Sequence, residues 1–351
     1  MSFTPDAWPA TVRTETELDD LLTTPSSRLV ASIREYASPL VILGAGGKMG
    51  PSLAVLARRA ADAAGHPLDV VAVSRFSNPA AREWLERRGV RTVSCDLLNG
   101  EAADLRALPD ASNLVYLVGL KFGTSKDPAT TWASNTLVPA RVCERYAGSR
   151  MVALSTGNVY PTSEPRRGGS VESDALTPVG EYANAAVGRE RVFEYASRRH
   201  GVRLAMLRLF YAVELRYGVP VDIATKVRDG EAIRLANGFF TCIWQGDANE
   251  AILRALPLAG PEPAAWNLCR SEVYSVREVA AHFGRRLGRD PVFQETESGT
   301  ALLGNPARLW AELGMPAVDM DRMVPWIADW VRDGGRNLGR PTHFETRDGS
   351  Y

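Results

Sequence analysis

Lysine and cysteine are scarce in this sequence. Only four of the 41 basic residues are lysines, so arginine carries almost all of the positive charge. The four cysteines, at positions 95, 143, 242 and 269, lie far apart and form no C-x-x-C pair. This spacing argues against a zinc site and against a disulfide framework, and it fits a reducing cytoplasm. Because His66, His200 and His282 have no partners nearby in sequence, we predict no metal site.

Net charge and long apolar runs are also lacking. The 41 basic residues balance 41 acidic ones, so no overall field attracts nucleic acid or an anionic membrane. No apolar run approaches the roughly 20 residues of a membrane span, and the N-terminus has no basic-then-apolar secretory pattern. We therefore expect a cytoplasmic protein whose partner is a small molecule, with no nucleic acid or membrane partner.

Short apolar runs alternate with helical patterns from residue 39 onward. This order is typical of βαβ units and predicts a doubly wound parallel α/β sheet, the Rossmann arrangement. Apolar residues at helical spacing follow the first run, and a long helix over 129–146 follows the fourth. The six predicted strands are "PLVILG", "LDVVAVS", "VRTVSCD", "NLVYLVG", "RMVALS" and "VRLAMLRLF".

Three regions are predicted along the chain. Residues 1–38 resemble an arm with one or two short helices, and residues 39–210 form the dinucleotide-binding domain. After residue 210 the alternation weakens and Trp, Phe and Pro become frequent. We interpret residues 211–351 as a smaller substrate-binding lobe and a polar tail.

A glycine-rich turn connects the first strand to the first amphipathic helix. Glycine permits a tight turn and a close approach of the backbone to a pyrophosphate, while the helix N-terminus offers N–H donors to the negative charge. The required order of strand, loop and helix is present, which makes a merely glycine-rich turn the weaker interpretation. The predicted cofactor-binding residues of this turn are Gly44, Gly46, Gly47, Lys48, Met49 and Gly50.

The end of the second strand bears on the choice of cofactor. An acidic residue there would bind the ribose 2′-hydroxyl of NAD, but Ser74 and Arg75 occupy the place. Because arginine can pair with a 2′-phosphate, NADP is favoured over NAD, and a solvated surface arginine is the alternative. Asp96 and Leu97, after the third strand, are predicted to contact the adenine, although Asp96 could instead cap a turn.

With these motifs in place, the chain resembles the extended short-chain dehydrogenase/reductase family of NAD(P)-dependent epimerases and dehydratases. The glycine pattern and "CDLL" look like its cofactor segments, and "YLVGLKFG" is similar to the fourth-strand stretch of UDP-galactose 4-epimerases. Asn135 looks like the asparagine of the following helix. The resemblance implies cofactor contacts from Val118, Gly119, Leu120 and Lys121, and from Phe210 in "LRLFYA".

Two further residues inherit catalytic positions from the resemblance. "STGNVY" is similar to the family's Ser-Ser/Thr-x-x-Val-Tyr motif, which implies that Thr156 hydrogen-bonds the reacting oxygen. Tyr182 stands at about the expected distance for the catalytic tyrosine, which also contacts the cofactor in the family. A buried aromatic at a helix start is the structural alternative for Tyr182, and Tyr160 is interpreted as structural.

The chain departs from the family at Ala186, where the Tyr-x-x-x-Lys motif has lysine. In the family that lysine binds the nicotinamide ribose and lowers the tyrosine pKa. Either Lys121 supplies the missing charge, or Tyr182 acts as a neutral phenol in a reaction that needs no tyrosinate, or the protein binds cofactor without catalysis. Arg189, about two turns after Tyr182, is expected to be too distant and to face solvent.

Candidate substrate contacts follow the sixth strand, and each of them could instead be core or surface. An arginine among them could grip a carboxylate or phosphate bidentately. The Gly-, Pro- and Ser-rich loop over 161–181 is expected to close over substrate. The candidates are Tyr211, Arg216, Tyr217, Phe240 and Trp244.

The function expected from these features is that of an NAD(P)-dependent epimerase, dehydratase or reductase acting on a sugar-like or polyhydroxylated compound. The alternative is a redox-neutral enzyme or a non-catalytic NAD(P)-binding sensor, because Ala186 replaces the lysine. The resemblance also implies a homodimer that pairs through the long helices around 129–146 and 182–199.

Overall fold

The computed structural model describes residues 8–120, 123–124, 126–340 and 342–349. Its centre is a parallel sheet of seven strands in the spatial order β3-β2-β1-β4-β5-β6-β11. This is the doubly wound order, in which the direction of winding reverses between β1 and β4. The strands are β1 (Leu40–Leu43), β2 (Val70–Ser74), β3 (Arg91–Ser94), β4 (Asn113–Tyr116), β5 (Arg150–Thr156), β6 (Arg203–Leu209) and β11 (Ala264–Leu268).

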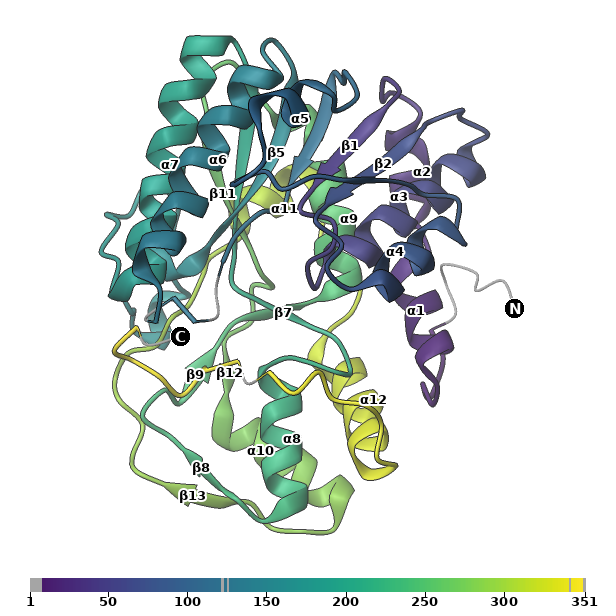
Figure 1. The fold of residues 1–351 in the computed structure, drawn as a ribbon. Coiled ribbons are helices and arrows are strands. Elements are labelled where there is room, and N and C mark those ends of the chain that lie inside the picture. The colour runs from purple at the N-terminus through teal and green to yellow at the C-terminus, as the bar shows by residue number, and fades with distance from the viewer. Residues whose placement is uncertain (1–7, 121–122, 125, 341, 350–351) are drawn as a thin grey trace.

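Helices cover both faces of this sheet and build a second lobe beside its carboxyl edge (Figure 1). The two short helices expected in the N-terminal arm are present as the first two. The helices are α1 (Glu15–Thr23), α2 (Ser27–Ile33), α3 (Gly50–Ala64), α4 (Pro79–Glu86), α5 (Ala102–Arg106), α6 (Pro128–Arg145), α7 (Gly180–His200), α8 (Val219–Asp229), α9 (Gln245–Arg254), α10 (Val276–Leu287), α11 (Ala307–Leu313) and α12 (Met320–Arg332), with 3-10 turns η1 (Gly157–Val159), η2 (Pro165–Arg167) and η3 (Leu256–Leu258).

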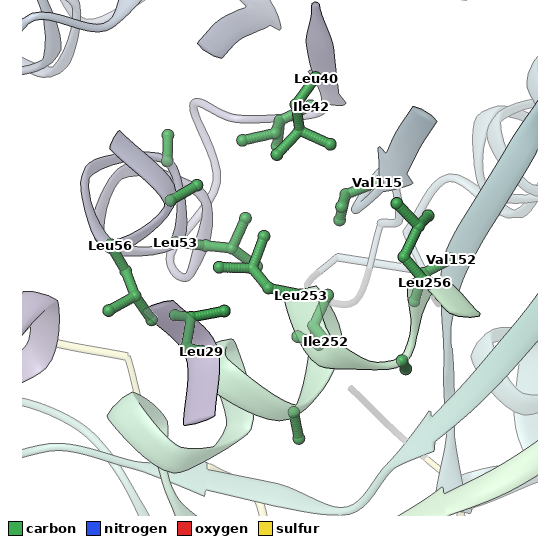
Figure 2. Packing of buried hydrophobic residues seen from close by; sticks show 14 of the residues in the cluster. Leu29, Leu40, Ile42, Leu53, Leu56, Val115, Val152, Ile252, Leu253 and Leu256 are labelled. Atoms are coloured by element: carbon green, nitrogen blue, oxygen red, sulfur yellow. The ribbon is translucent and has the colours of Figure 1, made fainter. Parts of the chain in front are cut away.

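The sheet is buried on both faces because successive strand residues point to opposite sides. In β1, Leu40 and Ile42 pack with α2, α3, α9 and α11, whereas Val41 and Leu43 pack with α5, α6 and α7. Figure 2 shows part of the first of these layers, which includes Leu40 and Ile42 together with Leu53 of α3 and Ile252 of α9. The continuous apolar runs of the sequence therefore report double-sided burial, and the predicted doubly wound fold is confirmed.

The number of sheet strands is seven, and the prediction of six was one too few. The missing strand is β11, which pairs with β6 from Ala264 opposite Ala205 to Leu268 opposite Leu209. Its sequence, "AAWNL", lies in a stretch rich in Pro and Trp that we assigned to the second lobe. An edge strand needs only one neighbour, so this short run gains its strand conformation from β6 rather than from its own pattern.

The second lobe has its own apolar core, which includes residues of α1, α8, α10 and α12. Three small two-stranded ladders accompany these helices: β7 (Tyr211–Val213) with β10 (Cys242–Trp244), β9 (Phe239–Phe240) with β12 (Tyr274–Ser275), and β8 (Ala232–Arg234) with β13 (Val292–Gln294). The lobe boundary at residue 210 stays a prediction. Segments beyond it, β11 and α9, pack with the large sheet.

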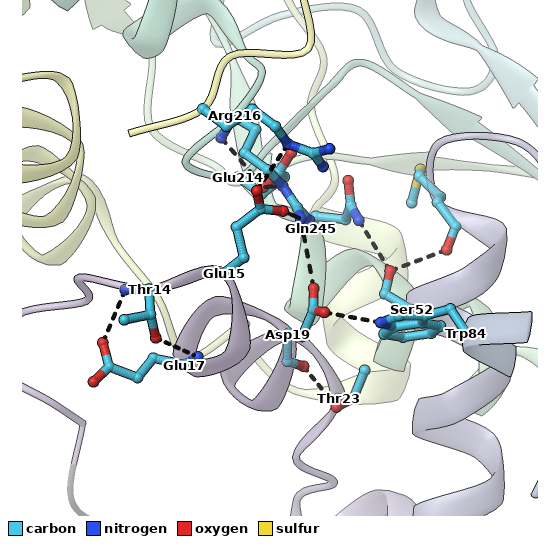
Figure 3. A network of polar contacts seen from close by, with 12 residues as sticks. Thr14, Glu15, Glu17, Asp19, Thr23, Ser52, Trp84, Glu214, Arg216 and Gln245 are labelled. Carbon is cyan, nitrogen blue, oxygen red and sulfur yellow. Dashed lines mark hydrogen bonds and ion pairs between the residues drawn. The ribbon is translucent and has the colours of Figure 1, made fainter. Parts of the chain in front are cut away.

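The N-terminal arm is tied to the rest of the protein by a polar network (Figure 3). Arg216 contacts Glu214 at 3.0 Å, Glu15 at 3.0 Å and Asp19 at 3.5 Å. Asp19 also accepts a hydrogen bond from the indole of Trp84 at 3.0 Å. Helix α1 is thereby joined both to α4 and to the loop after β7.

Candidate active site

Four segments that contain predicted site residues lie at the carboxyl edge of the sheet. The glycine turn begins directly after β1, Val118 follows β4, Thr156 ends β5, and Phe210 follows β6. In parallel sheets these strand ends lie at one edge, and ligands bind where the winding reverses. The topology thus brings together four segments that lie far apart in the sequence.

The glycine turn makes close contacts that side chains would block. Gly44 has φ +81°, and a Cβ atom there would lie 2.8 Å from the backbone nitrogen of Val118. A Cβ atom on Gly50 would lie 2.4 Å from the carbonyl oxygen of Ala45. Gly46 and Gly47, between them, are exposed. The turn is therefore folded tightly against β4 on one side and presents bare backbone on the other.

The helix that follows this turn has an uncapped N-terminus. The N-cap residue of α3 is Met49, and its side chain makes no hydrogen bond to the first N–H groups of the helix. Such a terminus suits an anion, because free N–H donors and the helix dipole both favour negative charge. Bare glycine backbone beside these donors fits a dinucleotide diphosphate, which Gly44 to Gly50 would hold.

Buried amides fix the position of α3. Ser52 accepts hydrogen bonds from Gln245 at 3.0 Å and from Asn249 at 2.9 Å, both on α9, and donates to the carbonyl of Met49 at 3.1 Å. Two of these contacts are visible in Figure 3. Helix α9 therefore anchors the first turn of α3, a role that the sequence pattern did not indicate.

The cofactor-selecting positions lie at the rim of this turn. The Ser74 hydroxyl lies against Gly46, where a Cβ atom would come within 2.5 Å of it, and Arg75 is exposed. Asp96 accepts hydrogen bonds from the backbone of Leu98 and Asn99, both at 3.0 Å, which hold its pKa below the usual value. Asp96 thus caps a turn as well as lying near Arg75.

Lys48 connects the glycine turn to the segment after β6. Its ammonium donates a hydrogen bond to the carbonyl of Ala212 at 2.9 Å and lies 4.0 Å from the ring centre of Tyr217. Burial raises the pKa of Tyr217, and the nearby Asp222 and Tyr182 raise it further. Lys48, Tyr217 and Tyr182, which we assigned to three different motifs, therefore lie in one neighbourhood.

Thr156 and Tyr182 lie on two elements that pack together. Thr156 is buried and forms the N-cap of η1, where its hydroxyl accepts a hydrogen bond from the backbone of Asn158 at 3.2 Å and donates to the Asn158 side chain at 3.1 Å. Tyr182 lies in the first turn of α7, and α7 packs against η1. A phenol and a threonine hydroxyl thus border the same end of the sheet.

Apolar groups surround the position where the family has lysine. Ala186 packs with Val159, Tyr160 and Phe210 in a small buried cluster. The Phe210 ring fills the space beside Gly157, where a Cβ atom would come within 2.5 Å of the ring. The ring also stacks on Tyr160 at 6.3 Å between centres. The site therefore has an aromatic wall next to the alanine.

A buried ion pair supports this wall from below. Glu190 and Arg208 make two hydrogen bonds, at 3.0 and 2.7 Å, with side chains that are 1% and 6% exposed. The Ser155 hydroxyl donates to Glu190, and Arg208 donates to the Tyr160 hydroxyl. Tyr160 in turn donates to Asn267 on β11 at 2.9 Å. This network joins β5, β6, α7 and β11, and it includes Ser155, the residue that precedes Thr156.

The predicted cations of the site have different outcomes. Lys121 lies outside the described residues, so its proposed contribution stays a prediction. The expectation that Arg189 faces solvent is wrong, because its side chain is 4% exposed. Its Nη1 atom donates to the carbonyl of Val118 at 3.3 Å. The expectation that Arg189 is too distant to contact Tyr182 stays a prediction. The contact with Val118, in the segment after β4, comes from the fold and had no signal in the helix pattern.

The predicted substrate contacts divide into two groups. Tyr217 lies beside Lys48 and Tyr182, and Tyr211 is partly buried on β7. Phe240 and Trp244 are each 1% exposed and belong to the core of the second lobe, so we do not retain them as substrate contacts. The guanidinium of Arg216 is held by three carboxylates, which leaves it poorly placed to grip a substrate anion.

The loop expected to close over substrate is attached to the second half of the chain. Ser163 and Ser170 form isolated bridges with Ala301 and Gly304. Glu172 accepts a hydrogen bond from the backbone of Asn267 at 2.8 Å. These contacts place the loop along the segment at 301–304.

A separate cavity of about 350 Å³ lies away from the glycine turn, between the N-terminal arm, α9 and the segment before α12. Trp8, Trp244 and Asp247 are among its lining residues. Within the described ranges, no group of three or more His, Cys, Asp or Glu side chains could hold a metal ion. No helix built from those residues is both long and apolar enough to span a membrane.

Comparison with solved structures shows the same fold in sugar-nucleotide enzymes. The UDP-glucose 4-epimerase of Thermus thermophilus in complex with NAD matches at 19% identity and TM-score 0.64, over 84% of this chain and 99% of that one. The UDP-Glc/GlcNAc 4-epimerase of Campylobacter jejuni matches at 18% identity and TM-score 0.67, over 85% and 99%. The UDP-glucuronic acid 4-epimerase of Bacillus cereus in complex with NAD matches at 16% identity and TM-score 0.68, over 84% and 96%.

A search of curated proteins finds no match. The model of the NAD-dependent epimerase/dehydratase family, a family of enzymes, matches residues 40–217, which is half of the chain and includes the glycine turn, Thr156 and Tyr182. The resemblance drawn from the sequence motifs agrees with this match. The chain belongs to the NAD-dependent epimerase/dehydratase family.

Proposed function

We propose that this protein is an NAD(P)-dependent epimerase or dehydratase that acts on a sugar nucleotide or another polyhydroxylated compound. The observation that carries the proposal is the meeting of an exposed glycine turn, an uncapped helix N-terminus, Thr156 and Tyr182 at one edge of the sheet. Family membership supports it, as do the UDP-sugar enzymes that share the fold.

In this proposal the substrate oxygen lies between two hydroxyl groups. Tyr182 exchanges a proton with that oxygen, and Thr156 turns its hydroxyl from Asn158 to hydrogen-bond it. A bound nicotinamide ring supplies the acceptor for hydride from the adjacent carbon. The aromatic wall formed by Phe210 excludes water from the reacting carbon.

The choice between NAD and NADP is a separate part of the proposal. The exposed Arg75 at the end of β2 supports NADP, since it can pair with a 2′-phosphate. The similar structures from T. thermophilus and B. cereus contain NAD. Titration calorimetry with both coenzymes in the same buffer decides between them. Tighter binding of NAD would mean that Arg75 does not select a 2′-phosphate.

Replacing Tyr182 by Phe tests the chemistry. The variant is expected to bind cofactor but to lose turnover of UDP-sugars by about 100-fold or more, because positioned proton transfer contributes on that scale. Tyr195→Phe is the matched control, since it removes a phenol hydroxyl from the same helix at a residue that is 66% exposed, and it keeps the apolar ring.

Unchanged turnover in Tyr182→Phe would remove this residue from the mechanism. If the wild-type protein binds coenzyme tightly but turns over no sugar nucleotide, the alternative of a non-catalytic NAD(P)-binding sensor is favoured instead. Ala186 is the observation behind that alternative.

We further propose a homodimer that pairs through α6 and α7. Large apolar side chains are exposed on both helices: Trp132 at 40%, Leu137 at 50% and Tyr195 at 66%. Such residues on neighbouring helices are typical of a covered face. Light scattering after size exclusion should give twice the monomer mass for the wild type, and Leu137→Glu should give the monomer. A monomeric wild type would contradict this proposal.

A further inference from the structure

Arg189 carries a buried positive charge that no carboxylate in the described part of the chain balances. The residue is 4% exposed. Among the described residues its buried Nε atom has no hydrogen-bond partner, and the one hydrogen bond of its side chain is the 3.3 Å contact from Nη1 to the Val118 carbonyl. No carboxylate among the described residues forms an ion pair with it. A buried charge without a counterion is costly and calls for a compensating group.

Arg208, a second buried arginine that contacts α7, shows how a structural cation is stabilised in the same region. Arg208 is equally buried, yet the Glu190 carboxylate pairs with it through two hydrogen bonds. Glu190 directly follows Arg189 in the sequence, but its oxygens are occupied by Arg208 and Ser155. Arg189 therefore differs from Arg208, because no carboxylate of the described ranges pairs with it.

The guanidinium of Arg189 lies at the floor of the cofactor turn. A Cβ atom on Gly119 would come within 2.8 Å of Nη1, so the guanidinium lies directly against the Gly119 backbone. The preceding residue, Val118, is the one whose backbone nitrogen lies under Gly44. The charge is thus placed where the glycine turn meets the end of β4, beside residues predicted to bind the coenzyme.

Helix geometry relates this charge to the missing lysine. Residues at positions 182, 186 and 189 follow the spacing of one helix face, and long helical side chains point toward the N-terminus. Arg189 therefore extends back toward the turn that contains Ala186, where only a methyl group occupies the face. An arginine one turn further along can in this way deliver a cation to the region that a lysine at 186 would serve.

We propose that Arg189 is the cation of this active site, contacting the nicotinamide nucleotide half of the bound coenzyme in place of the absent lysine. The inference rests on the proposed function, because it requires a dinucleotide at the glycine turn. The planar guanidinium offers its Nε–H and terminal N–H groups to the ribose and phosphate oxygens. Coenzyme binding then supplies the partner that the buried charge lacks.

Calorimetric titration of NAD into Arg189→Met tests this assignment. The affinity is expected to fall about tenfold or more, as for loss of a charge-assisted hydrogen bond. Arg191→Met is the control, because Arg191 lies on the same helix, is exposed and pairs with Glu194 at 2.8 Å; it should bind NAD as the wild type does.

The stability of the coenzyme-free protein separates this role from a structural one. Removing an unpaired buried charge should leave the melting temperature of Arg189→Met unchanged or raise it, whereas removing a structural cation should lower it. The double variant Ala186→Lys with Arg189→Met should recover NAD affinity, because the lysine returns a cation to the same face of α7.

The outcomes distinguish this inference from the proposed function. Wild-type protein that gives no binding heat with NAD or NADP would overturn the proposed function. Wild-type binding together with undiminished binding by Arg189→Met would overturn only the role of Arg189. If Arg189→Met does not fold, Arg189→Lys replaces it: the lysine keeps the charge but loses the fork geometry, and an affinity equal to the wild type would contradict the proposal.

Discussion

Single residues in this protein are explained by what lies within a few ångströms of them. Gly50 illustrates this, since a Cβ atom would lie 2.4 Å from the carbonyl of Ala45, and Gly100 does so again, where a Cβ atom would lie 2.3 Å from the carbonyl of Asp96. Neither glycine is required by its own backbone angle. The neighbour, and not the local conformation, forbids a side chain at these positions, so their importance appears only in the folded structure.

Asp247 shows how burial alone changes the chemistry of a residue. It lines the cavity beside α9, and burial raises the pKa of its carboxyl group to about 7, although it accepts a hydrogen bond from the backbone of Val318 at 2.8 Å. In the unfolded chain the pKa returns to about 3.9. Between these two values the native protein holds a proton that the unfolded chain has released.

The contribution of Asp247 to the stability of the wild type should therefore fall as pH rises from about 4 to about 7 and then level off. Asp247→Asn retains an oxygen for the Val318 N–H and carries no charge. Between about pH 5 and about pH 8, the free energy of unfolding of the variant should rise by on the order of a few kcal/mol relative to that of the wild type. Urea denaturation at both pH values measures this, and an equal difference at the two would contradict it.

Among elements, the junction of β5, β6 and α7 decides where the site residues point. Thr156 ends β5, Tyr182 begins α7, and the Glu190–Arg208 pair lies between these elements beneath them. Strand order places β5 next to β6, but packing alone does not determine how far α7 slides along them. The buried ion pair fixes the position of α7 along β6, since its two directional hydrogen bonds form only when Glu190 lies opposite Arg208.

Glu190→Gln should destabilise the protein by about 3–5 kcal/mol, because Arg208 would remain buried without a counterion. Glu194→Gln, which breaks an exposed pair with Arg191 on the same helix, should cost at most about 1 kcal/mol. Chemical denaturation of both variants provides the comparison. Similar losses in the two variants would show that the buried pair has no special role in holding α7.

At the scale of the whole molecule, the C-terminal segment connects the second lobe to the start of α7. Thr342 donates to Asp222 on α8 at 2.7 Å, and Glu345 pairs with Lys226 at 2.6 Å. Gly349 packs against Val179 and Gly180, where a Cβ atom would come within 2.3 Å of the Val179 carbonyl. Figure 1 shows this last segment running across the second lobe toward the base of α7.

Deleting the chain from residue 341 onward should therefore affect both lobes. We expect a lower melting temperature and weaker turnover, because α8 loses its buried partners and the first turn of α7, which carries Tyr182, loses its support. Coenzyme affinity should change less, since the deleted segment contacts α8 and the start of α7 and not the glycine turn. Thermal melts and NAD titrations of the deletion measure both effects, and wild-type melting with wild-type turnover would contradict this view.

The local sequence determined the fold class and the position of the coenzyme turn. Apolar runs buried on both faces, helices between them and glycines in strand–loop–helix order are short-range signals, and each is readable within about 30 residues. The same signals placed Thr156 and Tyr182 at strand and helix ends, and the fold brought those ends to one edge. The order of these segments along the chain was therefore enough to predict the fold class and the elements on which the main site residues lie.

Only the tertiary structure decided which polar and aromatic side chains are buried. Arg189 is buried where α7 meets the segment after β4, Phe240 lies in a core built partly by the distant α12, and β11 is a strand because β6 offers it a partner. Burial depends on every segment that packs against a residue, and those segments come from anywhere in the chain. A cation that looks solvated in the sequence can therefore become the buried charge of the site once the fold has closed over it.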